Sequence, residues 1–110
     1  MKIKKDKSAF LEYVGDTPQL RVLDFFIGNH FFDFPLTEIA RESEISYNSL
    51  KVVFPKFLER GILVESRRIG KSNYYRLNME NEFVQNMIKV AWHLAKMDIL
   101  KSPEDRLLAN

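Results

Sequence analysis

Basic side chains crowd one short stretch of the chain, residues 64–78, in which Gly70 marks a bend. The polar residues next to this glycine that could contact an anion are Arg67, Arg68, Lys71, Ser72 and Asn73. Cationic side chains with neighbouring hydroxyl and amide donors are the groups that bind nucleic-acid phosphates. The stretch therefore predicts a hairpin whose tip binds anions.

The distribution of charge supports the same interpretation. The chain has 110 residues and a formal net charge of only +2. Residues 46–78 hold seven basic and two acidic side chains, a net of +5, whereas residues 8–45 hold two basic and seven acidic side chains, a net of −5. A basic block between acidic blocks is typical of an anion-binding surface.

The sequence contains no group of residues typical of a catalytic or metal-binding site. The chain has two histidines, His30 and His93, far apart in sequence, and it has no cysteine. The letters IGKS resemble the end of a phosphate-binding loop, but Glu65 stands where that loop requires its first glycine. We therefore expect no enzyme, no cofactor and no metal. The absence of cysteine and of a long apolar segment predicts a cytoplasmic protein that does not enter a membrane.

Apolar spacing and capping residues predict mainly helices and a small β-hairpin, an α+β fold. Expected helices span residues 8–14, 18–28, 37–43, 46–60 and 80–101, and expected strands span 62–68 and 73–78, with a strand fragment at 34–36. Asp16 or Thr17, then Thr37 and Ser46, are the expected helix caps. Leu58 is expected in the buried stripe of the fourth helix, with Leu50 and Phe54.

The segment LTEIARESEISYNSLKVVFPKFLERGILVE resembles the winged helix-turn-helix superfamily, and the hairpin after it resembles the wing of small prokaryotic regulators of the ArsR and MarR type, with an archaeal character. The positions that carry the resemblance are Leu36, Thr37, Ile39, Ala40, Ile45, Ser46, Leu50, Phe54, Leu58, Gly61, Ile62 and Leu63. The resemblance implies double-stranded DNA as the partner. It also implies that the second helix of the motif reads the major groove while the wing contacts phosphates.

By this resemblance, the recognition helix presents its first residues to the DNA. They are Ser46, Tyr47, Asn48, Ser49, Lys51 and Val52. Asn48 could pair with adenine, and Lys51 could reach guanine or a phosphate. Two positions depart from the family pattern: Glu44 replaces a frequent glycine at the turn, and Pro55 lies inside the recognition helix. We expect a left-handed or altered turn at Glu44, and a kink or break at Pro55 that leaves a reading helix ending near Phe54.

The last predicted helix is too apolar for one small domain to cover. Twelve of the eighteen residues from 83 to 100 are apolar, whereas a helix packed on one domain needs an apolar stripe only a little over ~100° wide. A homodimer would cover the excess. The expected interface residues are Phe10, Val84, Met87, Ile88, Ala91, Trp92, Ala95 and Ile99.

These predictions divide the chain into a flexible basic arm at 1–7, a winged-helix domain at 8–79, a dimerisation helix at 80–101 and a tail at 102–110. The expected function is sequence-specific DNA binding by a homodimeric transcriptional regulator, a repressor. A plasmid or viral partition or replication protein remains open, as does a winged-helix protein–protein interaction module without DNA binding. The sequence leaves open whether a small-molecule effector binds.

Overall fold

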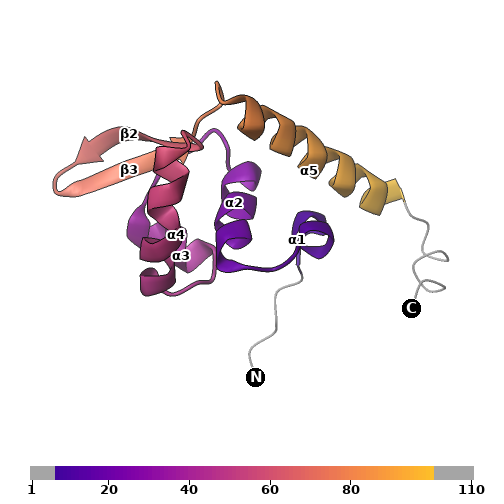
Figure 1. Cartoon of the computed structure of the whole chain (residues 1–110), viewed down its shortest axis with the longest axis horizontal. Coiled ribbons are helices and arrows are strands. Elements are labelled where there is room, and N and C mark those ends of the chain that lie inside the picture. The colour runs from indigo at the N-terminus through magenta and orange to yellow at the C-terminus, as the bar shows by residue number, and fades with distance from the viewer. Residues whose placement is uncertain (1–6, 101–110) are drawn as a thin grey trace.

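The computed structural model describes residues 7–100. The elements of this part follow the order α1 (Ala9–Val14), α2 (Pro18–Gly28), β1 (Phe34–Pro35), α3 (Leu36–Glu42), α4 (Tyr47–Glu59), β2 (Leu63–Ile69), β3 (Ser72–Leu77) and α5 (Glu82–Leu100) (Figure 1). This order confirms the predicted α+β fold with a hairpin and a long last helix. Lys101, the predicted tail at 102–110 and most of the predicted arm, residues 1–6, lie outside the described residues.

Capping side chains fix where most of the helices begin. Ser8 accepts a hydrogen bond from the backbone N–H of Leu11, and Thr17 accepts one from that of Leu20, each over 3.1 Å. Thr17, rather than Asp16, is thus the cap of α2. The prediction that Thr37 caps α3 is wrong, because the cap is Pro35, two residues earlier, and the helix begins at Leu36. The pairing of Pro35 with Tyr74 holds that backbone extended, so the strand decides where the helix starts.

Helix α2 lies at the centre of the fold and contacts α1, α3, α4, α5 and β3. Its Val22 and Phe26 are fully buried, as are Ile39 of α3 and Leu50 of α4. Burying side chains of this size stabilises the fold by roughly 1.5–3 kcal/mol each. The prediction that Leu58 lies in the buried stripe of α4 is wrong: its side chain is 39% exposed.

The three strands form an antiparallel sheet in the order β1-β3-β2. Strands β2 and β3 are joined by a two-residue turn at Gly70 and Lys71, in which Gly70 adopts a left-handed φ of 60°. Ser66 has no partner residue in the register between Glu65 and Arg67, so the hairpin carries a bulge there. The hairpin projects from one end of the molecule, and α5 runs toward the other end, over α1 (Figure 1).

Helix α4 runs from Tyr47 to Glu59 and passes through Pro55. The prediction that the reading helix ends near Phe54 is therefore wrong. Pro55 lies on the exposed face, whereas Phe54 and Phe57 on either side of it are buried and fix the backbone in the helical path. The carbonyl of Lys51 that loses its N–H donor lies one turn earlier on the same exposed face, where water can satisfy it. Burial of the flanking aromatic residues thus outweighs the helix-breaking tendency of proline.

Candidate nucleic-acid interface

The first half of α4 exposes most of the residues expected to read DNA. Ser46 caps the helix by accepting the Ser49 N–H over 3.0 Å, and its own hydroxyl donates to the Ser49 hydroxyl over 2.9 Å. Asn48 and Lys51 are exposed, and Val52 is 72% exposed. Tyr47 lies under the Lys51 ammonium, which is 5.8 Å from the ring centroid. Ser49 is half-buried and engaged with the cap, so it is the least accessible of the set.

The turn between α3 and α4 is held in a left-handed conformation. Glu44 has a φ of 57° and, among the described residues, is the one non-glycine residue with positive φ. The N–H of Ile45 donates to the Ala40 carbonyl and that of Glu44 to the Arg41 carbonyl, both over 3.1 Å. This pair of bonds is the Schellman arrangement that ends a helix and usually has glycine at the left-handed position. Glu44 adopts it at a conformational cost.

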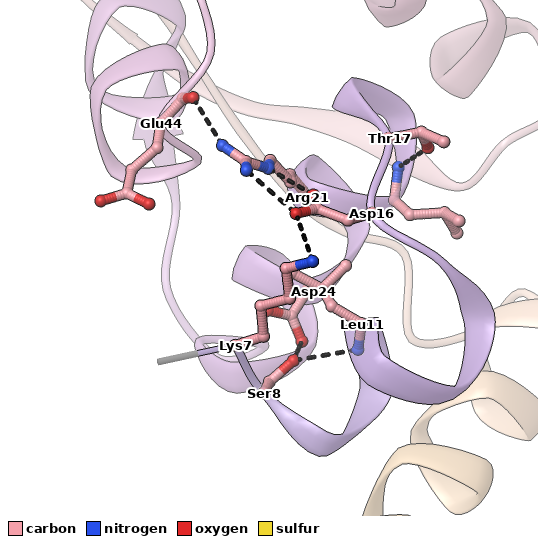
Figure 2. A network of polar contacts seen from close by, with 9 residues as sticks. Lys7, Ser8, Leu11, Asp16, Thr17, Arg21, Asp24 and Glu44 are labelled. Carbon is pink, nitrogen blue, oxygen red and sulfur yellow. Dashed lines mark hydrogen bonds and ion pairs between the residues drawn. The ribbon is translucent and has the colours of Figure 1, made fainter. Parts of the chain in front are cut away.

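A guanidinium from α2 supports this turn (Figure 2). Arg21 donates from Nη1 to the Glu44 carbonyl oxygen over 3.0 Å, and its Nε and Nη2 both donate to the carboxylate of Asp16. The Lys7 ammonium forms an ion pair with the same carboxylate at 3.3 Å. Lys7, the last residue of the predicted flexible arm, is thus anchored. The turn that positions α4 is therefore tied to α2 through one side chain.

These hydrogen bonds shift the pKa values of both Asp16 and Arg21. The hydrogen bonds from Arg21 are the main cause that lowers the pKa of Asp16 from 3.8 to about 2, with Lys7 adding to the effect and burial opposing it. The hydrogen bond with Asp16 raises the pKa of Arg21. Asp16 therefore stays ionised, and holds Arg21 toward Glu44, throughout the neutral range.

The wing is the hairpin of β2 and β3. Its predicted phosphate-binding cations differ in whether a carboxylate already engages them. Arg67 donates to both carboxylate oxygens of Asp33, over 2.8 and 3.1 Å, and lies over the Tyr74 ring at 4.9 Å from its centroid. Ser66 donates to the same carboxylate over 2.6 Å. Hydrogen bonds from Arg67 and Ser66 hold the pKa of Asp33 below its ordinary value. The charge of Arg67 is thus largely compensated, and sequence reasoning missed Asp33 because it lies 34 residues away.

The remaining wing residues are better placed for an anion. Lys71 and Ser72 are exposed, and Arg68 donates from Nε to the Gly70 carbonyl at the tip over 3.1 Å. An open groove of about 230 Å³ separates the start of α4 from the wing. The residues lining this groove are Pro35, Leu36, Thr37, Tyr47, Lys71, Ser72, Asn73 and Tyr75. The structure thus brings Tyr47 of the predicted reading set together with Lys71, Ser72 and Asn73 of the predicted wing set.

The expected interface residues of α5 divide into two groups. Phe10 and Val84 are buried in the core of the single chain, 3% and 1% exposed, and offer almost no surface to a second copy. Met87, Ile88 and Ala91 pack partly against the same core, and Ala95 is half-buried. Trp92 and Ile99 are 67% and 75% exposed. Further exposed apolar residues of α1 and α5 are Tyr13, Val14, Phe83, Val90, Met97 and Leu100.

Two absences concern the described residues 7–100. They contain no group of three or more His, Asp or Glu side chains gathered as a metal site would require. No helix in this range combines the length and the apolar character needed to cross a membrane.

Comparisons with known proteins identify the fold. The structure matches that of NadR in complex with 4-hydroxyphenylacetate with a TM-score of 0.60 and 15% identity, over 92% of this chain and 73% of that chain. It matches reduced HlyU from Vibrio cholerae N16961 with a TM-score of 0.57 and 17% identity, over 78% of this chain and 84% of that chain. These neighbours are winged-helix transcription regulators. No family model matches the sequence, and no curated protein does. The chain has the winged helix-turn-helix fold.

The lowered pKa of Asp16 predicts how stability depends on pH. A carboxylate whose folded pKa lies below its unfolded value stabilises the fold above about pH 4, and this contribution disappears as the pH falls toward 2. Wild type should therefore be more stable than Asp16→Asn at pH 6, and the difference should shrink between pH 4 and 2. Urea unfolding at several pH values measures this difference. Glu65→Gln, which removes an exposed carboxylate on the wing, is the control. A wild-type advantage that stays constant down to pH 2 would contradict the assignment.

Proposed function

We propose that this chain is a sequence-specific double-stranded DNA-binding protein that acts as a homodimeric transcriptional regulator. The observation that carries the proposal is the pairing of two surfaces across one groove. Tyr47 at the exposed start of α4 lines one side of the groove, and the wing residues Lys71, Ser72 and Asn73 line the other. The winged-helix regulators that share the fold support the same function.

Helix α4 would enter the major groove with its first two turns. Asn48 and Val52 are one turn apart on the exposed face, and Lys51 lies beside them. An asparagine can form two hydrogen bonds with adenine, a lysine can reach guanine, and an apolar side chain can contact the thymine methyl group. The helix therefore carries the residue types that distinguish base pairs, and we assign the sequence specificity to it.

The wing would contribute affinity through the phosphate backbone. Lys71 is exposed at the tip and borders the groove next to Tyr47, where a DNA strand leaving the major groove would pass. Arg68 is exposed next to it. Arg67 would contribute less, because its guanidinium is already engaged by Asp33. We infer that Lys71 and Arg68, rather than Arg67, are the phosphate-binding cations of the wing.

The exposed apolar residues of α5 support the homodimer. Phe83, Val90 and Met97 recur every seven residues along one side of the face that packs on the core, and Trp92 and Ile99 recur at the same spacing along the other side. Together with the buried face they exceed the stripe that one domain covers. A second copy of α5, supplemented by Tyr13 and Val14 of α1, would bury them. A two-fold dimer would present two copies of α4 to an inverted-repeat site, and a dimer bound at a promoter would act as a repressor.

The first experiment tests reading by α4. Selection from random duplex DNA should return an inverted repeat with wild type and a changed half-site with Asn48→Ala. A lost bidentate base contact costs about 1–3 kcal/mol of discrimination, so affinity for the wild-type site should fall by that amount while non-specific binding stays unchanged. Identical motifs from both proteins would contradict the role of Asn48. No binding to any duplex at low salt would contradict the proposed function and favour a protein-interaction module.

The second experiment separates the wing cations. Lys71→Ala should weaken binding to all sequences alike and lower the slope of log affinity against log salt by about one unit per lost phosphate contact. Arg67→Ala, on the same hairpin, should change this slope less. Fluorescence anisotropy at several salt concentrations measures both variants. A larger loss of slope with Arg67→Ala would show that the ion pair with Asp33 opens on DNA.

The third experiment tests the dimer. Trp92→Glu places a charge within the exposed apolar surface and should convert the dimer to a monomer in light scattering, because burying an unpaired charge is costly. Lys89→Glu, on the polar side of the same helix, should leave the dimer intact. A wild type that is monomeric at micromolar concentrations would exclude the homodimer.

A further inference from the structure

The C-terminal end of α4, close to the start of α5, is followed by a second left-handed turn. Gly61 has a φ of 68°, the N–H of Gly61 donates to the Leu58 carbonyl over 3.1 Å, and the N–H of Ile62 donates to the Phe57 carbonyl over 2.9 Å. These bonds repeat the Schellman arrangement found at Glu44. The carbonyl of the left-handed residue again accepts side-chain donors from outside the helix. At this end the donors are two asparagines that the sequence analysis did not single out.

Asn81 connects α4 with α5 through both ends of its amide. Its Nδ2 donates to the carbonyl oxygens of Arg60 and Gly61 over 3.2 and 3.0 Å. Its Oδ1 accepts the backbone N–H of Val84 over 3.1 Å, and its carbonyl accepts that of Gln85 over 3.0 Å, so Asn81 caps α5. One half-buried side chain therefore bonds to the two residues that directly follow α4 and to the first turn of α5.

Asn78, which follows β3, adds further hydrogen bonds between the end of α4 and the start of α5. We call this junction, formed by Arg60, Gly61, Asn78 and Asn81, the joint. Its Nδ2 donates to the Gly61 carbonyl over 2.9 Å, and its Oδ1 accepts the N–H of Glu80 over 3.2 Å. Its backbone N–H donates to the carbonyl of Ile62 over 2.9 Å, and its carbonyl accepts the N–H of Asn81 over 3.1 Å. The Gly61 carbonyl thus accepts hydrogen bonds from both asparagines, and the end of α4 is bonded to the residues that connect β3 with α5.

We propose that Asn81, supported by Asn78, is a positioning residue that fixes the orientation of α5 relative to the recognition helix and thereby sets the spacing of the two reading helices in the dimer. The proposal rests on the proposed function. Each α4 would be carried by its own α5, which packs on α1 and α2 and is hydrogen-bonded to the end of α4 through this joint. The distance between the two copies of α4 would then depend on how rigidly the joint holds. A regulator of this geometry accepts one separation of half-sites and rejects others.

Two substitutions separate the joint from the helix cap. Asn81→Ser keeps an oxygen that can accept the Val84 N–H but is too short to reach the Arg60 and Gly61 carbonyls. Asn81→Asp also keeps the cap and has no N–H to donate. Gln85→Ala is the matched control, because Gln85 lies in the first turn of α5 and donates over 2.9 Å to the Met79 carbonyl, outside α4. If one Asn81 variant fails to fold, the other still tests the joint.

The first measurement does not require DNA. The natural chain has no cysteine, so a spin-label pair can be attached through Lys56→Cys on α4 and Lys89→Cys on α5, both at exposed positions. Labelled chains are diluted with unlabelled protein, and pulsed dipolar spectroscopy gives the distribution of the intrachain distance. We expect a narrow distribution for wild type and Gln85→Ala and a broad one for Asn81→Ser and Asn81→Asp. Distributions as narrow as wild type in both Asn81 variants would overturn the proposal.

The second measurement uses duplexes whose two half-sites are separated by different numbers of base pairs. The preference of wild type for one spacing over its neighbours should fall by about tenfold in the Asn81 variants, while affinity for an isolated half-site stays unchanged. An unchanged spacing preference would overturn the proposal. If wild type binds no duplex, the proposed function fails, and the distance distributions still support or overturn the joint by themselves.

Discussion

The structure depends on two left-handed residues, Glu44 and Gly61, which lie just before and just after α4. At each of them the chain leaves one helix sharply, and the carbonyl that the turn exposes accepts hydrogen bonds from side chains of other elements. Arg21 of α2 donates at the first turn, and Asn78 and Asn81 donate at the second. The buried stripe of α4 fixes which face of the helix points outward. The two turns fix where the helix begins and ends relative to the other elements.

Ion pairs with distant carboxylates determine the charge of the surface as much as the number of basic residues does. The basic block predicted from residues 46–78 is present, but Asp33 from outside the block engages Arg67. What remains is a smaller set of exposed cations: Lys71, which lines the groove, Arg68 next to it in the wing, and Lys51 on α4. A phosphate strand between them would meet cations that have no carboxylate partner among the described ion pairs. The proposed DNA-binding surface is therefore narrower than the count of basic residues indicates.

Local patterns in the sequence predicted the fold, because caps, apolar spacing and turn glycines act over a few residues. Ser46 was identified as a cap on this basis, and Thr17 as one of two candidates beside Asp16. The predicted helix boundaries were wrong where residues distant in the sequence determine them. Strand pairing sets the start of α3 before Thr37, and packing against the core keeps α4 helical through Pro55. The roles of Asp33 and Asn81 could not be predicted, since their partners lie about twenty or more residues away and no local pattern marks them.

We propose that two copies of α4 are held by their α5 helices at a fixed separation and read DNA from one side. Hydroxyl-radical footprinting of the selected site tests it most directly, because the cleavage pattern reports which sugars along each strand are covered. We expect two protected regions separated by about one helical turn, roughly 10 base pairs, on one face of the duplex. A single protected region, or uniform protection that does not depend on sequence, would contradict it.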